Sequence, residues 1–376
     1  MKTIKLYDEN AYLTEFCASV VCCEKTERGY AIILDKTAFF PEEGGQSADT
    51  GTLDGETVFD VQINGDTITH FVKRELSGEV CGKIDWDTRY DKMQQHTGEH
   101  IVSGLVNKLY GYDNVGFHLG DDDVTFDFNG PLTREELDKI ELLANEIIYK
   151  NLPISTYYPK DPSTLEYRSK SDIAGDVRIV EIKDTDMCAC CAPHVKNTGE
   201  VGIIKLLEAQ SYKGGVRIHL ACARRAVIDY QTKFYNLGII ATALSSGKNN
   251  AAEFFTKYLG DVENLRAQLS QYKKANLELL ANTIEKTDGN IVIFDTMDAS
   301  DVRGFVNALD GKYGGLCAIF SKNANGYNFV IASKTVALRT LADSLRKTLG
   351  AKCGGSDAMI QGSVNATEID IRKIIE

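Results

Sequence analysis

The sequence predicts an α+β protein in four parts, and three observations lead to this prediction. Residues 1–90 hold short alternating or apolar runs separated by Gly, Asp and Asn, which predicts a small β-barrel or curled sheet. Strand patterns disappear over 226–287, where the spacing of apolar residues is helical. Strand and helix patterns alternate over 288–376, which predicts a C-terminal α/β domain. Residues 91–225, between the barrel and the helical linker, are expected to form an α+β domain.

Two helices are expected in this second part before short strands return. Apolar residues recur at helical spacing after Lys92 and predict a helix that ends near Leu109. Another helix is expected to begin near Thr133, because Thr133 and Glu136 form a capping-box pattern. Strand-like runs follow over 152–220, on both sides of a segment rich in cysteine.

The helical linker is divided by the run SSGKNN at 245–250. The second stretch has residues at alternating four- and three-residue steps, namely Tyr258, Val262, Leu265, Leu269, Tyr272, Asn276 and Leu279. This is a heptad pattern with Asn276 at an a position, where a polar residue can fix register. Two alternatives fit three heptads: a helix packed on its own chain, or a homodimer seam through the 250–287 helix.

Composition narrows the class of protein. With 376 residues, 43% of them hydrophobic, the chain can bury a core and is not expected to be disordered. No run approaches the roughly 18 apolar residues of a membrane span, and the first residues lack a signal-peptide pattern, so we expect a cytoplasmic protein without a membrane partner. The ten cysteines are then expected to be thiols or metal ligands rather than disulfides. The net charge of −12 argues against nonspecific coating of nucleic acid, but not against a folded RNA partner.

Two pairs of residues predict a zinc site. His96 and His100 are four apart on a predicted helix, which places both imidazoles on one face. Cys190 and His194 are again four apart, in the run MCACCAPHV. One cysteine and three histidines suit one tetrahedral zinc ion. Two further cysteines could replace Cys190, namely Cys188 and Cys191.

The first pair also fits the HxxEH pattern of inverted zinc metallopeptidases, in which Glu99 would be the general base. Such a site needs a downstream glutamate, Glu166 or Glu181, and both lie in strand-like or irregular sequence. This alternative leaves the Cys190/His194 pair unexplained and is disfavoured. We expect Thr97 and Glu99 to point away from the ligand face, and Glu99 to face solvent.

A glycine-rich turn, FFPEEGGQSADTG, occupies residues 39–51. Gly44 and Gly45 allow positive φ and close approach to another surface, and Gln46 adds an amide that can donate and accept. A plain hairpin loop is the alternative interpretation.

In this order, the glycine turn, the His96/His100 pair, the segment VTFDFNGPLTREEL and the Cys190/His194 pair resemble the free-standing alanyl-tRNA editing proteins (AlaX type, long form). They also resemble the editing half of alanyl-tRNA synthetase, and the terminal GGSDAMIQGS is similar to its glycine-rich C-terminal domain. The family often has Cys-Gly-Gly-Thr-His where this chain has CCAPH, which keeps the ligand spacing but loses the hydroxyl.

The resemblance implies a zinc-dependent hydrolase that removes wrongly attached serine, and sometimes glycine, from tRNA(Ala), without aminoacylation activity. It implies serine recognition at Thr37 and contact with substrate or water at Gln46; a structural strand threonine is the alternative for Thr37. A non-catalytic tRNA-binding protein with structural zinc is the second interpretation. Basic residues proposed to contact tRNA are Arg217, Arg224 and Arg225 near the pocket, and Arg339, Arg346 and Lys347 in the C-terminal domain.

Overall fold

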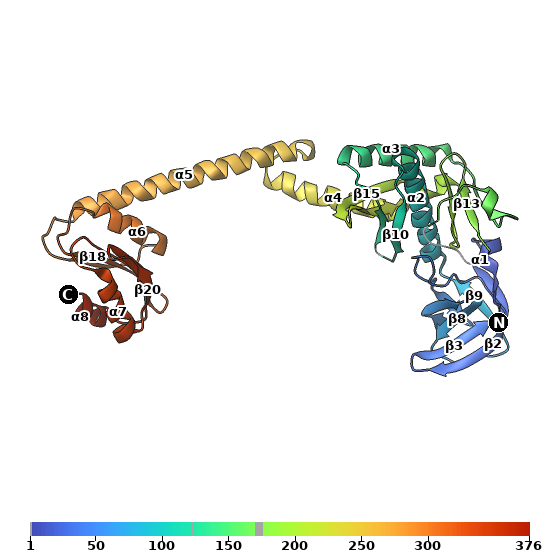
Figure 1. Cartoon of the computed structure of the whole chain (residues 1–376), viewed down its shortest axis with the longest axis horizontal. Coiled ribbons are helices and arrows are strands. Elements are labelled where there is room, and N and C mark those ends of the chain that lie inside the picture. The colour runs from blue at the N-terminus through green and yellow to red at the C-terminus, as the bar shows by residue number, and fades with distance from the viewer. Residues whose placement is uncertain (1, 122, 170–175) are drawn as a thin grey trace. The chain divides into compact units, whose positions relative to one another are not determined.

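The computed structural model describes residues 2–121, 123–169 and 176–376. It confirms a mixed α+β architecture and divides the chain into two compact units, Met1–Asn236 and Leu237–Glu376 (Figure 1). The finer division into four parts stays a prediction. Among the described residues, no helix combines the length and the apolar character needed to cross a bilayer.

The first unit begins with a seven-stranded, nearly closed, barrel-like sheet in the order β6-β5-β9-β2-β3-β8-β7, as expected for residues 1–90. Burial alternates along β8 and β9, so one face of each strand lines the core. The strands are β2 (Glu15–Thr26), β3 (Gly29–Leu34), β5 (Gly51–Leu53), β6 (Glu56–Val58), β7 (Asp60–Asn64), β8 (Thr67–Val72) and β9 (Glu79–Ile84). Beside them lie β1 (Ile4–Lys5), α1 (Leu6–Glu9) and β4 (Lys36–Thr37).

Helix α2 (Trp86–Tyr110) passes from the barrel-like sheet into the rest of the unit. It begins two turns before the Lys92 start expected from the sequence, with Asp85 as its N-cap. The apolar stripe does not reveal these first turns, because their buried face is made of Arg89 and Lys92 rather than of apolar residues. The helix ends at Gly111, which adopts the left-handed conformation favoured at this position.

Two more sheets surround α2. The four-stranded sheet has the order β10-β11-β16-β15, and the three-stranded sheet has the order β12-β13-β14. Their strands are β10 (Asn114–Leu119), β11 (Val124–Phe128), β15 (Ile204–Tyr212), β16 (Gly215–Cys222), β12 (Ile154–Tyr157), β13 (Ile179–Ile182) and β14 (Asp186–Ala189). Helix α3 (Arg134–Lys150) starts with the predicted capping box of Thr133 and Glu136. Short 3-10 helices are η1 (Pro162–Thr164) and η2 (Thr198–Val201).

The expected helical stretches are present as α4 (Ala223–Ala243) and α5 (Ala251–Thr283), separated by η3 (Lys248–Asn250). The second unit contains α5 and a five-stranded sheet in the order β17-β18-β19-β21-β20. The strand patterns expected within 288–376 form β17 (Ile291–Asp295), β18 (Leu316–Asn323) and β19 (Gly326–Ser333). The terminal glycine-rich segment contributes β20 (Lys352–Gly355) and β21 (Met359–Val364). Helices α6 (Ala299–Ala308), α7 (Leu338–Leu349) and α8 (Glu368–Ile375) complete the unit.

The expectation that the cysteines form no disulfide is wrong at one pair. Cys17 and Cys81 lie directly opposite each other on the antiparallel strands β2 and β9 and are joined by a disulfide. The pairing depends on strand register across 64 residues, which cysteine spacing does not encode. The other eight cysteines are free thiols.

Candidate metal centre

Four predicted ligands converge in the first unit. His96 and His100 lie on consecutive turns of α2, and Cys190 and His194 lie in the segment that follows β14. One nitrogen or sulfur atom from each of the four residues lies within 4.8 Å of the others. The Sγ atom of Cys190 is 3.6 Å from Nε2 of His96 and 3.4 Å from Nε2 of His194. Three imidazoles and one thiol in such a group suit a tetrahedral zinc ion.

The other ring nitrogen of each histidine has a partner that fixes the ring. Nδ1 of His96 lies 2.8 Å from Oε1 of Gln46, Nδ1 of His100 lies 2.8 Å from Oδ2 of Asp186, and Nδ1 of His194 lies 3.0 Å from Oγ1 of Thr97. Such contacts select the tautomer and leave Nε2 to bind a metal. Nε2 of His100 is buried and has no hydrogen-bond partner among the described residues, which leaves it available to an ion.

The thiol pKa distinguishes Cys190 from the two neighbouring cysteines, because their surroundings differ. Burial alone would raise the pKa of the Cys190 thiol, but the charge of His96 and the ring nitrogens of His100 and His194 lower it well below its usual range. Burial raises the pKa of Cys188 to about 12 and also raises the pKa of Cys191. Because the thiolate is the metal-binding form, the electrostatics favour Cys190 among the three candidates.

Asp186 connects the centre to Arg168. The carboxylate accepts from Nε of Arg168 at 2.7 Å and from its terminal nitrogen at 2.9 Å, while it also contacts His100. Burial opposes ionisation of Asp186, but these two partners lower its pKa. Burial lowers the pKa of His100, whereas the contacts with Asp186 and Cys190 outweigh this and raise it to about 9. A metal would therefore displace a proton from His100 on binding.

The glycine turn forms one wall of the centre. Gly44 and Gly45 have φ values of 63° and 84°, and a Cβ on Gly45 would lie 2.3 Å from the carbonyl oxygen of Phe117. The backbone of Gly45 accepts from the amide of Leu119 at 2.7 Å, and the amide of Ser47 donates to Leu119 at 3.0 Å. The expected close approach of this turn to another surface is thus present, and it brings the side chain of residue 46 to the metal ligands.

Gln46 is fully buried and has one side-chain atom without a partner. With its amide oriented so that Oε1 accepts from His96, the Nε2 donor makes no hydrogen bond to the described residues. A buried N–H group without an acceptor costs roughly 1–3 kcal/mol, so a site that keeps one gains when a ligand oxygen reaches it.

Thr37 is also fully buried, at the end of β4. Its hydroxyl lies 2.8 Å from Nε2 of His70 and accepts from the backbone amide of Phe39 at 3.1 Å. The other ring nitrogen of His70 lies 3.2 Å from the carbonyl oxygen of Ile32. Recognition of a substrate hydroxyl by Thr37 stays a prediction; the Thr37 hydroxyl has two acceptor lone pairs in addition to its O–H donor, so it can accept a further hydrogen bond beside these two contacts.

Two expectations about α2 are wrong. Glu99 does not face solvent: its side chain is fully buried and accepts from Ser103 at 2.5 Å and from Asn114 at 2.6 Å. The side chain of Thr97 does not point away from all ligands, since its hydroxyl lies 3.0 Å from Nδ1 of His194. Glu99 is buried because other elements cover most faces of α2 from Gln95 to Val106, and Thr97 meets His194 because the segment after β14 packs against the helix.

The glutamates that the peptidase alternative requires are not members of the metal-ligand group. Glu181 lies on β13 and accepts from the hydroxyl of Tyr157 at 3.1 Å. Neither it nor Glu166 is among the described residues whose donor atoms converge with His96 and His100. This arrangement weighs against the peptidase alternative.

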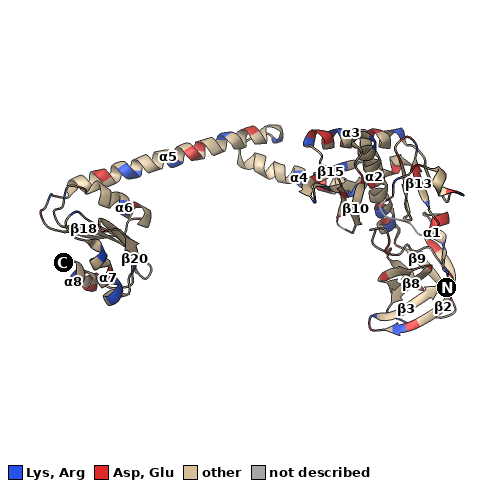
Figure 2. Ribbon diagram, in the orientation of Figure 1, with Lys and Arg blue, Asp and Glu red and all other residues tan. Residues whose placement is uncertain are grey.

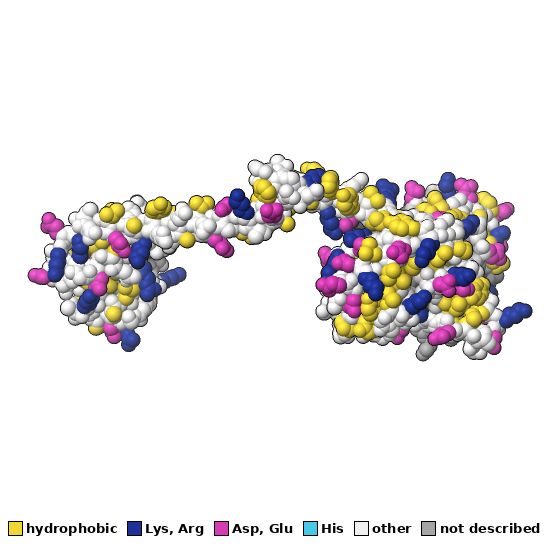
Figure 3. All heavy atoms as spheres, turned by 90° about the horizontal axis from the view of Figure 1, so that it is seen from above, with side chains coloured by type: hydrophobic (Ala, Val, Ile, Leu, Met, Phe, Trp, Pro, Cys, Tyr) yellow, Lys and Arg dark blue, Asp and Glu magenta, His cyan; other side chains and the backbone are white. Residues whose placement is uncertain are grey.

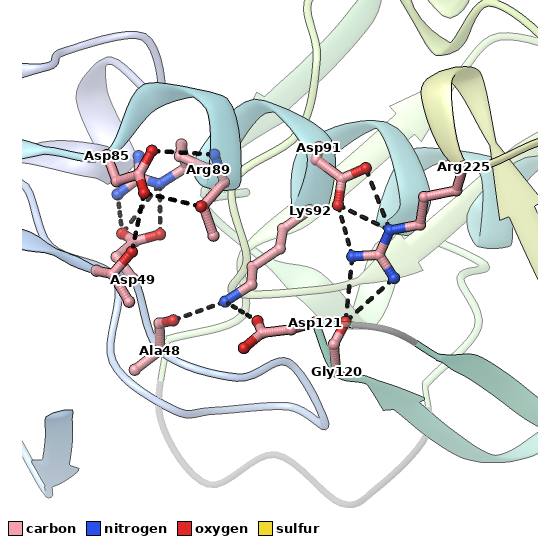
Figure 4. Close-up of polar contacts among 11 residues, drawn as sticks. Ala48, Asp49, Asp85, Arg89, Asp91, Lys92, Gly120, Asp121 and Arg225 are labelled. Atoms are coloured by element: carbon pink, nitrogen blue, oxygen red, sulfur yellow. Dashed lines mark hydrogen bonds and ion pairs between the residues drawn. The ribbon is translucent and has the colours of Figure 1, made fainter. Parts of the chain in front are cut away.

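A second polar cluster lies on the first turns of α2 (Figure 4). Arg89 and Asp49 form a fully buried ion pair, with Nε of Arg89 2.9 Å from both carboxylate oxygens of Asp49. Lys92 reaches the carbonyl oxygen of Ala48 at 2.8 Å and Oδ1 of Asp121 at 3.2 Å. These contacts attach the glycine turn to α2.

The basic residues proposed to contact tRNA differ in their partners. In the first unit, Arg217 makes two contacts with Asp127 at 2.7 and 2.8 Å, Arg225 binds Asp91 and the carbonyl oxygen of Gly120, and Arg224 is exposed. In the second unit, the basic residues are exposed, with Arg339 near Asp357, Arg346 bound to Asp343, and Lys347 on α7. Figure 2 shows acidic and basic residues mixed along both units rather than separated.

Comparison with known proteins identifies the family. The model of the "Threonyl and Alanyl tRNA synthetase second additional domain" matches residues 177–219, and that of "tRNA synthetases class II (A)" matches residues 7–88. The alanyl-tRNA editing protein AlaX-L of Pyrococcus horikoshii is 28% identical over 98% of this chain and 96% of its own length. The alanyl-tRNA editing protein Aarsd1-A of Xenopus laevis is 32% identical over 75% of this chain and 72% of its own length.

An alanine–tRNA ligase of Ignicoccus hospitalis is 34% identical over 82% of this chain, and the chain spans only 36% of that ligase. The match to the editing proteins extends over most of both partners, as expected from the ordered motifs of the sequence. The chain belongs to the family of alanyl-tRNA editing proteins, related to alanyl-tRNA synthetase.

Proposed function

We propose that the protein is a trans-editing hydrolase that deacylates Ser-tRNA(Ala), with Gly-tRNA(Ala) as a second substrate to be tested, and that it does not aminoacylate tRNA. The observation that carries the proposal is the convergence of four ligand atoms beside a buried amide donor. The relatives named as alanyl-tRNA editing proteins support the same reaction. The chemistry is hydrolysis of the ester between the amino acid and the terminal ribose.

His96, His100, Cys190 and His194 would hold one zinc ion. The donor set fits this ion, because three imidazole nitrogens and a sulfur whose thiol pKa is lowered lie within 4.8 Å of one another. When bound, zinc supplies Lewis acidity and a rigid template for the substrate.

We propose that Gln46 acts on the ester itself. Its Nε2 donor is buried beside His96 and lacks a partner among the described residues, so it can donate to the carbonyl oxygen as negative charge develops there. The glycine turn keeps this donor in place through its backbone contacts with Leu119. Thr37 would distinguish serine from alanine through the serine hydroxyl, as a site that hydrogen-bonds a hydroxyl can reject the substrate lacking it.

We propose tRNA as the partner and the cytoplasm as the location. Exposed Arg224, Arg339 and Lys347 are suited to phosphate contacts, whereas Arg217 and Arg225 would have to share their carboxylate partners. We also propose a homodimer through α5, because Leu265, Leu269, Tyr272 and Leu279 of the heptad pattern are exposed. Hydrophobic side chains along the helical stretch are visible at the surface in Figure 3.

A non-catalytic tRNA-binding protein with structural zinc is the second candidate. One observation favours it: four ligand atoms lie within 4.8 Å of one another, and if all four bound one zinc ion they would fill a tetrahedral site and leave no position for water.

The deciding experiment measures deacylation of Ser-tRNA(Ala), with Ala-tRNA(Ala) as the control, before zinc removal, after removal and after its return. Selective release of serine that disappears with zinc and returns with it supports the hydrolase. Binding of tRNA without release by a folded, zinc-loaded sample would contradict it and favour the second candidate.

A further inference from the structure

Three basic side chains lie along the first turns of α2, namely Arg89 and Lys92 of the helix itself and Arg225 of α4 (Figure 4). Their carboxylate partners differ in exposure. Arg89 and Asp49 both have side chains that are 0% exposed, so their pair belongs to the core. Arg225 and Asp91 are 17% and 26% exposed and are joined by more than one hydrogen bond. Lys92 is 1% exposed, but the side chain of its partner Asp121 is 75% exposed.

The exposure of each carboxylate partner determines which of the three basic side chains can exchange that carboxylate for another anion. An exposed carboxylate loses little when it leaves an ion pair, because water can solvate it, whereas a buried ammonium continues to need an anion. Among the described residues, the Asp121 carboxylate lies 3.2 Å from Lys92, and because 75% of its side chain is exposed, water can solvate it when another anion takes its place at the buried ammonium. The carbonyl oxygen of Ala48 at 2.8 Å keeps the ammonium group in position meanwhile. The ammonium group of Lys92 is therefore fixed in position, while the anion that it pairs with can be exchanged for another.

The location of Lys92 relates it to the candidate metal centre. Lys92, His96 and His100 follow one another at steps of four on the same helix, so their side chains share a face, with about 6 Å between turns. The glycine turn runs alongside: Gln46 contacts His96, and Ala48 contacts Lys92. In the row of side chains from His100 to Lys92, the end at Lys92 lies toward solvent, because its partner Asp121 is exposed.

In the proposed substrate, the ester and the nearest phosphate follow one another in the same order as the metal centre and Lys92 along α2. Its amino acid is esterified to the ribose of the terminal nucleotide, and the nearest negative charge is the 5′-phosphate on the other side of that ribose. With the ester beside Gln46 and His96, that phosphate would fall toward the surface, one helical turn away. A lysine ammonium is a common phosphate ligand in proteins.

We propose that Lys92 binds the 5′-phosphate of the terminal nucleotide, which takes the place of the Asp121 carboxylate. This inference rests on the proposed function. It makes Lys92 a positioning residue that aligns the ester with the metal centre without touching the bond that breaks. Asp121 acts as a stand-in anion that keeps the buried ammonium paired when no substrate is bound.

The test uses the full chain and two small substrates that differ by one phosphate, the 2′(3′)-O-seryl esters of AMP and of adenosine. Wild type is expected to hydrolyse the AMP ester with a kcat/KM about 10- to 100-fold higher, since hydrogen bonds to charged groups have this range of effect. Lys92→Met should remove most of this preference, mainly through KM, and Lys92→Arg should restore most of it.

Asp121→Asn is expected to raise kcat/KM for the AMP ester by about two- to fivefold, since the exposed carboxylate no longer competes with the phosphate for Lys92. Lys139→Met is the control, because Lys139 is an exposed lysine on α3 and the substitution removes the same charge. Bound zinc per chain and the melting temperature report whether each variant folds.

Equal losses on both esters in folded Lys92→Met would overturn the inference, since the lysine would then serve only the structure. A wild type that prefers neither ester would overturn it as well. If wild type releases serine from no substrate, including Ser-tRNA(Ala), the proposed function itself fails. The two failures are therefore distinguishable.

Discussion

Helix α2 carries two buried polar clusters, one in its first turns and one in its middle, and the two differ in how their buried polar groups are compensated. In the first turns, the guanidinium of Arg89 is paired with Asp49 and also donates to the carbonyl oxygens of Ala11 and Ala38. One turn beyond Lys92, the ligand atoms of His96 and His100 converge with those of Cys190 and His194.

The cluster in the first turns is closed, because its charge is compensated by other groups of the protein, and the metal-ligand group is open, because one of its ligand atoms lacks a hydrogen-bond partner among the described residues. The protein compensates the charge of Arg89 from within, so this cluster needs no other group. In the metal-ligand group, every Nδ1 is held, while Nε2 of His100 has no hydrogen-bond partner among the described residues. An open cluster of this kind is completed by an ion, and a closed one stabilises the fold.

The largest effect is expected from Cys190→Ala. Loss of the thiolate should reduce bound zinc from about one ion per chain to near zero and lower deacylation by about 1,000-fold, since a metal supplies several kcal/mol at such a site. Elemental analysis and the rate on Ser-tRNA(Ala) measure this. Cys191→Ala, at the adjacent cysteine, is the control and should keep its zinc. Full zinc content in Cys190→Ala would show that the site is assigned wrongly.

Arg89→Met breaks the closed cluster. It leaves Asp49 buried without its partner and should lower the free energy of unfolding by about 3–5 kcal/mol, as urea titration would show. The folded variant should still bind one zinc ion per chain. If it lost zinc while folded, the two clusters would not be separable.

A third buried group gives a pH dependence. Burial lowers the pKa of His70 to about 4, so the folded protein keeps its ring neutral, while the unfolded chain protonates it near pH 6.5. The free energy of unfolding should therefore fall as pH drops from about 6.5 to about 4, by up to about 3 kcal/mol. His70→Gln should flatten this part of the curve in chemical denaturation at several pH values. An unchanged slope would mean that His70 does not stay neutral.

Gln46 tests how the open cluster is held. Gln46→Met removes the partner of His96 and should weaken zinc binding by about 10- to 100-fold in competition with a chelator. Gln46→Glu keeps an acceptor for His96 but lacks the amide donor, so it should bind zinc and still deacylate slowly. Wild-type turnover by Gln46→Glu would exclude the amide from stabilising the developing charge.

The smallest effect is expected at the surface of the second unit. Lys347→Ala should weaken tRNA binding only slightly and reduce its salt-dependence slope by about one, as for one lost phosphate contact. Binding measured at several salt concentrations detects this, with exposed Lys322→Ala as the control. Identical slopes in the two variants would exclude Lys347 from the interface.

Local patterns in the sequence determined much of this protein. The capping box set the start of α3, and the four-residue spacings of the two ligand pairs predicted the group that now lies within 4.8 Å. The need for glycine in the 39–51 turn was also visible, because positive φ and close approach are properties of that residue type. Each of these signals acts within a few residues of chain, where backbone geometry alone decides what can meet.

Only the tertiary structure determined which residues from distant parts of the sequence contact the residues of these local patterns. Asp186 meets His100 across 86 residues, Arg89 meets Asp49 across 40, and Cys17 meets Cys81 across 64. The burial of Glu99 likewise follows from the sheets packed around α2. No local spacing encodes these contacts, because they depend on strand register and on how the sheets enclose the helix, which are properties of the folded chain as a whole.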